Sequence, residues 1–145
     1  MQQSLLITLI FIMSCQSSQK VEYLQTEKHA KMGLPFSEAV RVGDMLYLSG
    51  QVGNIPGELK VVPGGIGPET SQIMENIKTV LERYGSSMDQ VVKCLCMLEN
   101  IEDWPAMNAE YEKHFPNHKP ARSAFGGSEL AIGAKVEIEC MASVN

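Results

Sequence analysis

The organisation of this chain is decided by residues 120–144, which read PARSAFGGSELAIGAKVEIECMASV. The pattern predicts two short strands, one opened by Arg122 and one carrying Glu137 and Glu139 at alternate positions. Residues two apart in a strand share a face, so both carboxylates point one way and the apolar residues between them point to the core. An unpaired buried charge is costly, so a covered carboxylate needs a partner. We therefore expect Arg122, or a ligand held between Arg122 and a glutamate, to provide it.

Upstream, helical and strand periodicities alternate. An apolar stripe at spacings of one, three and four residues predicts one helix, with Pro68 in its first turn and Gly85 as its C-terminal cap. Asp103 is expected to cap a second helix that Pro116 stops. The predicted elements are strands at Phe36–Arg41, Met45–Val52 and Val91–Leu98, a short hairpin within Leu59–Val62, and helices at Pro68–Tyr84 and Trp104–Phe115.

The order of these elements, ββ–α–β–α–ββ, predicts an α+β domain with a single mixed sheet and both helices on one face. The opposite face is left without a helix, so we expect it to pack against a partner subunit. The 145 residues, 44% of them apolar, suit one domain. The net charge of −5 and the absence of a basic cluster argue against a nucleic-acid partner.

The N-terminus resembles a processing signal. The apolar run Leu5–Met13 suits the core of a signal peptide, and Ile12-Met13-Ser14-Cys15 resembles a bacterial lipobox. This pattern predicts that residues 1–14 are removed, that Cys15 is lipidated and that residues 15–27 form a tether. The mature chain would then be an exported, periplasmic lipoprotein held at a membrane only through Cys15. The alternative is a disordered extension with no targeting role.

Several short segments, in this order, resemble the reactive intermediate deaminase (Rid, or YjgF) family. The resemblance covers residues 28–145, which we take as the folded domain, and it implies a chorismate-mutase-like fold, a homotrimer and active sites between subunits. The matching segments are Leu46-Tyr47-Leu48-Ser49-Gly50-Gln51, Gly64-Gly65-Ile66, Glu75-Asn76-Ile77, Asn108 three residues before Tyr111, Pro120-Ala121-Arg122-Ser123, and Lys135-Val136-Glu137-Ile138-Glu139.

The resemblance implies two catalytic residues. Arg122 would hold the substrate carboxylate in a bidentate contact, and Glu137 would orient and activate a water molecule. Spacing alone favours a plainer role for Arg122, an ion pair with Glu137 or Glu139. Glu139 is the competing candidate for the water-activating carboxylate, and it is otherwise an ordinary strand residue.

Five further residues match positions that line the family's substrate pocket. Ser49 and Gly50 end a strand, where glycine also serves ordinary turns. Asn108 lies in the second predicted helix, where a surface role is the alternative. Phe36 and Ala124 depart from the family pattern, because the best-studied deaminases have tyrosine at the first position and many bacterial members have cysteine at the second. The lost tyrosine hydroxyl suggests a changed substrate range.

The cysteines and histidines indicate no metal site. We interpret Cys94 and Cys96 as core thiols, because they point to one side of a strand and lack further ligands. Four cysteines are too few for a disulfide scaffold. His29, His114 and His118 have no ligand-spaced partner.

The resemblance implies hydrolysis of reactive 2-imino acids, or their enamine tautomers, to 2-oxo acids and ammonia. No cofactor is expected for this reaction, because a protonated imine is already electrophilic. The alternative is an exported, non-catalytic trimer that binds small carboxylates. Ribonuclease activity is disfavoured by the acidic charge.

Overall fold

The computed structural model describes residues 19–127 and 129–144. The predicted signal peptide, residues 1–14, and the predicted lipidation site at Cys15 lie outside the described residues. No helix among the described residues has the length and apolar character needed to cross a membrane. The elements are β1 Val21–Leu24, α1 Glu27–Lys31, β2 Ala39–Val42, β3 Met45–Leu48, β4 Gln51–Val52, α2 Ile66–Arg83, β5 Val91–Leu98, α3 Trp104–Tyr111, β6 Ala121–Gly126 and β7 Val136–Ser143, with short 3₁₀ turns at Met88–Gln90, Ile101–Asp103, Glu112–His114 and Ala131–Gly133.

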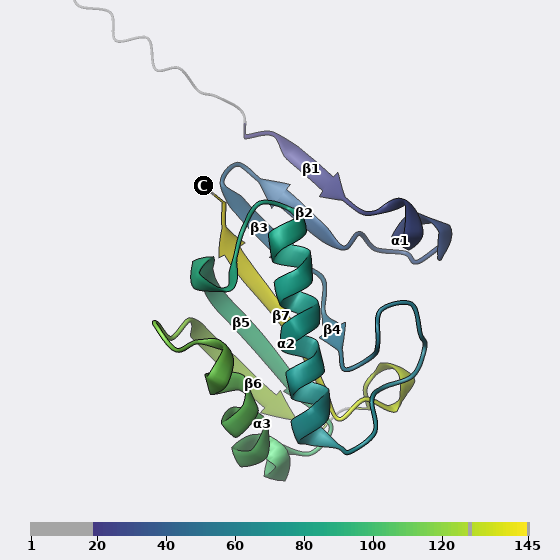
Figure 1. Cartoon of the computed structure of the whole chain (residues 1–145), viewed down its shortest axis with the longest axis vertical. Helices are drawn as coiled ribbons and strands as arrows, with labels where there is room; N and C mark the ends of the chain where they lie inside the picture. Colours follow the sequence, from purple (N-terminus) through teal and green to yellow (C-terminus); the bar gives the residue numbers. More distant parts are fainter. Residues whose placement is uncertain (1–18, 128, 145) are drawn as a thin grey trace, which may run out of the picture.

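The strands form one mixed sheet in the order β1-β2-β3-β7-β5-β6, with β4 also paired to β7. β5 runs parallel to β6, because the crossover between these two strands passes through α3. It runs antiparallel to β7. Helices α2 and α3 lie together on one face of the sheet (Figure 1). The predicted α+β architecture, a single mixed sheet with two helices on one face, is therefore confirmed.

The core lies between α2 and the helix-covered face of the sheet. The apolar stripe of α2 is buried against inward-pointing residues of the central strands β5 and β7. Buried and half-buried residues alternate along all of β7 and, in β5, from Lys93 onward. The fully buried side chains of this layer include Ile73, Met74, Ile77, Leu81, Leu98, Val136 and Ile138.

A disulfide joins the two central strands. Cys94 of β5 is directly opposite Cys140 of β7, and their sulfur atoms are bonded, whereas Cys96 is free and buried. The interpretation of Cys94 as a core thiol is thus wrong, although that of Cys96 is right. The alternation pattern places Cys140 on the core face, but only the register of β5 against β7 brings it to Cys94.

The predicted strand Met45–Val52 is split into β3 and β4 by a bulge. Tyr47 pairs with Met141 and Gln51 pairs with Ile138, so four residue steps on one strand oppose three on β7. The extra residue falls at Ser49-Gly50, where the ladder is interrupted and the chain bends. The predicted hairpin at Leu59–Val62 is reduced to one isolated bridge, between Asn54 and Val61.

The ends of both helices differ from the predicted bounds. α2 begins at Ile66, before Pro68, and Gly85 has the expected positive φ of 82° after its last turn. α3 ends at Tyr111 and continues as a 3₁₀ turn. Asp103 makes no side-chain cap; instead Asn100 accepts from the Glu102 backbone N–H at 3.0 Å, because a 3₁₀ turn precedes α3.

The segment assigned to the tether contributes to the sheet. Residues 21–24 form β1, which pairs antiparallel with β2 along its whole length. Glu38 anchors the turn between β1 and α1, because its carboxylate accepts hydrogen bonds from the Thr26 backbone N–H at 2.8 Å and from the Tyr84 hydroxyl at 2.6 Å. The ordered structure therefore starts earlier than residue 28.

The face opposite α2 and α3 carries both apolar and polar side chains and is partly exposed. Tyr47 of β3 and Phe125 of β6 expose 41% and 46% of their surfaces. Between them the open face carries a shallow hollow of about 200 Å³, lined by Lys93, Leu95, Ser123, Glu139 and Met141. Apolar and charged side chains therefore alternate on this face, which no helix of the described residues covers.

Candidate active site

Arg122 lies on the helix-covered face of the sheet. It pairs in register with Cys94, whose side chain points into the core, so its own side chain leaves β6 on the same side. The guanidinium carbon is 4.8 Å from the ring centre of Tyr111 and 6.0 Å from that of Trp104. One guanidinium nitrogen is 4.0 Å from the sulfur of Met107. In the part of the chain that the structure describes, Arg122 is thus held by cation–π contacts and not by a carboxylate.

These neighbours all come from one face of α3. Positions 107 and 108 each lie three or four residues from both 104 and 111, so the four side chains share one side of the helix. The hydroxyl of Tyr111 and the side-chain oxygen of Asn108 are buried without a hydrogen-bond partner in the described residues. Burial raises the pKa of the Tyr111 phenol, so the hydroxyl stays protonated and able to donate. Arg122, Tyr111 and Asn108 are therefore available to a polar ligand.

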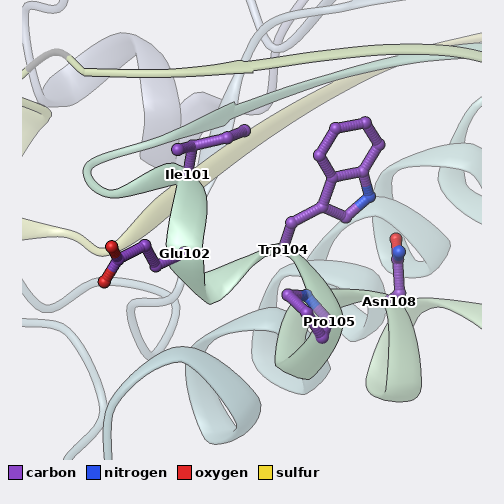
Figure 2. Close-up of a pocket in the computed structure, with 5 residues that line it drawn as sticks. All are labelled: Ile101, Glu102, Trp104, Pro105 and Asn108. Carbon is purple, nitrogen blue, oxygen red and sulfur yellow. The ribbon is translucent and has the colours of Figure 1, made fainter.

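A solvent-open hollow of about 650 Å³ borders this group. Its lining residues are Ile101, Glu102, Trp104, Pro105 and Asn108. Figure 2 shows the Trp104 ring and the Asn108 amide directed to the same side of α3, with the Glu102 carboxylate pointing away from the indole. We call Arg122, Trp104, Asn108 and Tyr111 the arginine half-site.

Glu137 lies on the other face of the sheet. It pairs with Met97 of β5 and with Val52 of β4, and it is next to the buried Val136 and Ile138, which point to the core. Gly50 of the bulge faces it so closely that a Cβ there would be 1.9 Å from a carboxylate oxygen of Glu137. Any side chain at position 50 would displace this carboxylate, so the glycine of the bulge allows Glu137 its position.

The environment of Glu137 favours proton uptake. Burial, followed by the negative charge of Glu139, raises the pKa of the Glu137 carboxyl above its ordinary value. Within the described residues the carboxylate makes neither an ion pair nor a side-chain hydrogen bond. A half-buried carboxylate of this kind suits a general base, because its raised pKa strengthens its affinity for a proton.

Ser49 precedes Gly50 in the bulge and is hydrogen-bonded to the segment that follows Phe36. The Ser49 hydroxyl donates to the carbonyl of Ser37 at 2.7 Å, which joins the bulge to the segment after Phe36. Phe36 is 50% exposed and makes an edge contact with the His29 ring at 5.8 Å. We call Phe36, Ser49, Gly50 and Glu137 the glutamate half-site.

The two half-sites do not meet within one chain. Arg122 and Glu137 leave the sheet on opposite faces, two strands and three residue steps apart, or about 14 Å between Cα atoms at ordinary strand spacings. The expectation that Arg122 partners a glutamate, directly or through a ligand, is therefore not met inside a single subunit. Nor is an ion pair with Glu139, which shares the face of Glu137.

Ala124 lies on β6 two residues after Arg122 and shares its face, directly beside the buried Cys96 of β5. The sequence interpretation missed Trp104 and Tyr111 as neighbours of Arg122. Their spacing with Asn108 on one helix face was an available signal. Among residues 19–127 and 129–144, no three His, Cys, Asp or Glu side chains gather as metal ligands would.

The chain matches the Endoribonuclease L-PSP family over residues 26–144. Reactive Intermediate Deaminase A of Arabidopsis thaliana is 36% identical over 128 residues, which are 88% of this chain and 68% of that protein. The 2-iminobutanoate/2-iminopropanoate deaminase of Capra hircus is 39% identical over 108 residues, 74% of this chain and 79% of that protein.

Solved structures give the same result. The Rid-family protein YyfA of Yersinia pestis superposes with a TM-score of 0.78 and 34% identity, covering 86% of this chain and all (100%) of that chain. RidA from the Antarctic bacterium Psychrobacter sp. PAMC 21119 has a TM-score of 0.73 and 28% identity, covering 89% and 100%.

Proposed function

This chain belongs to the Endoribonuclease L-PSP (YjgF/Rid) family, and we propose that it hydrolyses 2-imino acids, or their enamine tautomers, to 2-oxo acids and ammonia. Water adds to the imine carbon, the carbon–nitrogen bond breaks, and the nitrogen leaves as ammonia with the protons that the water supplied. The oxygen of water becomes the keto oxygen, so no electrons are gained or lost.

Arg122 binds the substrate carboxylate in this proposal. Among the described residues this guanidinium has no carboxylate partner, so it is ready for a bidentate contact, and the rings of Tyr111 and Trp104 lie against it and orient it beforehand. The orphaned oxygen of Asn108 accepts a hydrogen bond from the imine N–H, which stabilises the protonated, electrophilic form. This arrangement orients the imine carbon toward solvent and toward an adjoining subunit.

Glu137 activates the water. Its carboxylate accepts a proton from the attacking water molecule, and its raised pKa makes this transfer easier than it is for an ordinary glutamate. Glu139 tunes that pKa through its negative charge and does not touch the substrate.

A second copy of the chain unites the two half-sites. We propose a homotrimer in which the open face of one subunit, with Glu137, packs toward the β6 edge of the next, with Arg122. The exposed apolar side chains of the open face, Tyr47 and Phe125, support this assembly. Heterologous contacts among three copies can close into a ring, so that every copy is paired.

The observation that carries the proposal is the setting of Arg122, which has no carboxylate partner among the described residues and lies against the Tyr111 and Trp104 rings beside two orphaned polar atoms. The test is ammonia release from freshly generated 2-iminopropanoate and 2-iminobutanoate by the purified mature protein. We expect the wild-type protein to release ammonia above the spontaneous rate and Arg122→Ala to abolish this release. No acceleration with either compound would overturn the proposal.

Phe36 favours a second candidate, an exported trimer that binds small carboxylates without turnover. A phenylalanine supplies no hydroxyl to fix a water molecule or a polar substrate group. The same assay separates the two candidates, because a binding protein would show Arg122-dependent binding of 2-oxo acids and no release of ammonia.

We also propose export as a lipoprotein. The apolar run and Ile-Met-Ser-Cys motif support it, and the Cys94–Cys140 disulfide suits an oxidising compartment. Mass spectrometry of the native protein is expected to find a lipidated Cys15 at the N-terminus. An intact Met1 would contradict this.

A further inference from the structure

We propose that Trp104 and Ile101 form a subsite for the substrate's side chain, and that the preferred substrates are 2-imino acids with a large apolar side chain, aromatic or branched aliphatic. This inference rests on the proposed function in one respect, namely that Arg122 holds the carboxylate. It assigns a substrate class that the comparisons leave open.

The first step is the position of Trp104 relative to Arg122. The guanidinium carbon lies 6.0 Å from the centre of the Trp104 ring, so a carboxylate bound to Arg122 is about one side-chain length from the indole. The substrate's own side chain starts one carbon beyond that carboxylate. It therefore extends along the indole into the hollow.

The second step is the character of the hollow. Trp104 exposes 39% of its surface and Ile101 exposes 45%, which are large fractions for apolar side chains that border a site. Pro105 adds a third apolar wall, and the space of about 650 Å³ far exceeds what a methyl group fills. A benzyl or isobutyl group would cover the indole and Ile101 and release the water on them.

The third step is charge. Glu102 also lines the hollow, although its carboxylate points away from the indole (Figure 2). A substrate with a second carboxylate would meet this like charge at the mouth of the subsite. The subsite therefore favours uncharged apolar side chains over acidic ones.

The test compares kcat/KM for imino acids generated in place by an amino-acid oxidase from phenylalanine, leucine, alanine and glutamate. We expect the first two to exceed the alanine-derived compound by about 10–200-fold, the range that a hydrophobic pocket provides. The glutamate-derived compound is expected to be the poorest. Equal values for the phenylalanine- and alanine-derived compounds would overturn the inference.

Variants at Trp104 locate the preference. Trp104→Ala should lower the phenylalanine-to-alanine ratio toward one, whereas Trp104→Phe, which retains an aromatic wall, should keep most of it. Leu59→Ala is the matched control, because Leu59 is an apolar residue 77% exposed on the loop before α2. A ratio unchanged in Trp104→Ala would also overturn the inference.

A binding experiment separates this inference from the proposed reaction. Stable 2-oxo acids need no turnover, so 3-phenyl-2-oxopropanoate and 2-oxopropanoate are titrated by calorimetry. The phenyl compound should bind at least about tenfold more tightly than 2-oxopropanoate, and Trp104→Ala should lose this difference. That result would support the subsite even if no imino acid is hydrolysed. Hydrolysis of all imino acids at one rate, with equal binding of both oxo acids, would leave the proposed function standing and reject the subsite.

Discussion

Arg122 and Glu137 point away from opposite faces of the same sheet. Arg122 shares a face with Cys94 and the core, whereas Glu137 shares a face with Met97 and the open side. A small imino acid cannot touch both residues of one chain. Any reaction that uses both must therefore draw them from two subunits, and this requirement can be tested directly.

Mixed assemblies of two inactive variants should regain activity. Arg122→Ala and Glu137→Gln chains are dissociated together and reassembled in equal amounts. Each heterologous site takes Arg122 from one subunit and Glu137 from the next, so about one site in four has both residues intact and about a quarter of wild-type turnover should return. Ammonia release is the measurement, and reassembled Arg122→Ala alone is the control. A mixture no more active than its parents would show that the site is not shared.

Glu137→Gln should lower turnover while raising stability. The amide keeps the shape but removes the base, so kcat should fall by about 10²–10⁴-fold. Because burial raises the pKa of Glu137, the ionised carboxylate destabilises the fold, and this cost is present once the pH exceeds that pKa. At pH 7 the variant should therefore melt at a higher temperature than wild type. Glu139→Gln should change turnover much less.

As the pH is lowered, the activity of the wild-type protein should begin to fall at a higher pH than an ordinary glutamate base would give. Turnover requires the ionised Glu137, so the acid limb of kcat/KM should lie above 4.5, the ordinary value for a glutamate. The limb should vanish in the residual activity of Glu137→Gln. An acid limb at or below 4.5 would remove Glu137 as the base.

Arg122 should affect binding more than it affects stability. Arg122→Ala removes a charged bidentate contact worth about 2–5 kcal/mol in a desolvated site, so 2-oxo acids should bind poorly. Arg122→Lys should restore only part of this affinity, since an ammonium lacks the planar fork. Calorimetric titration beside a thermal melt checks both. A large fall in melting temperature with unchanged affinity would assign Arg122 a structural role instead.

The Cys94–Cys140 disulfide should contribute measurably to stability. The bridge closes a loop with a sequence separation of 46, for which the chain-entropy account gives about 4 kcal/mol. A reductant should lower the melting temperature of wild type and have little effect on Cys140→Ala. Peptide mapping without reduction should find Cys94 linked to Cys140 and Cys96 free. Free thiols at all three positions in protein from an oxidising compartment would contradict the bridge.

Much of this could be predicted from the sequence because the signals are local. The helical stripe ending at Gly85 gave α2, and the apolar run of β5 gave a central strand with its bounds as the structure has them. Helical and strand periods reflect which side chains face a core, and caps and turns depend on the residues beside them. The α+β class and a sheet with one uncovered face follow from the order of those elements alone.

The relations across the sheet were decided only by the tertiary structure. Whether Arg122 and Glu137 share a face depends on how β6 registers against β5 and β5 against β7, and strand period alone carries no register between strands. The pairing of Cys94 with Cys140 and the placing of Trp104 beside Arg122 have the same origin. Sequence spacing identified the residues, whereas long-range strand pairing divided them between two half-sites.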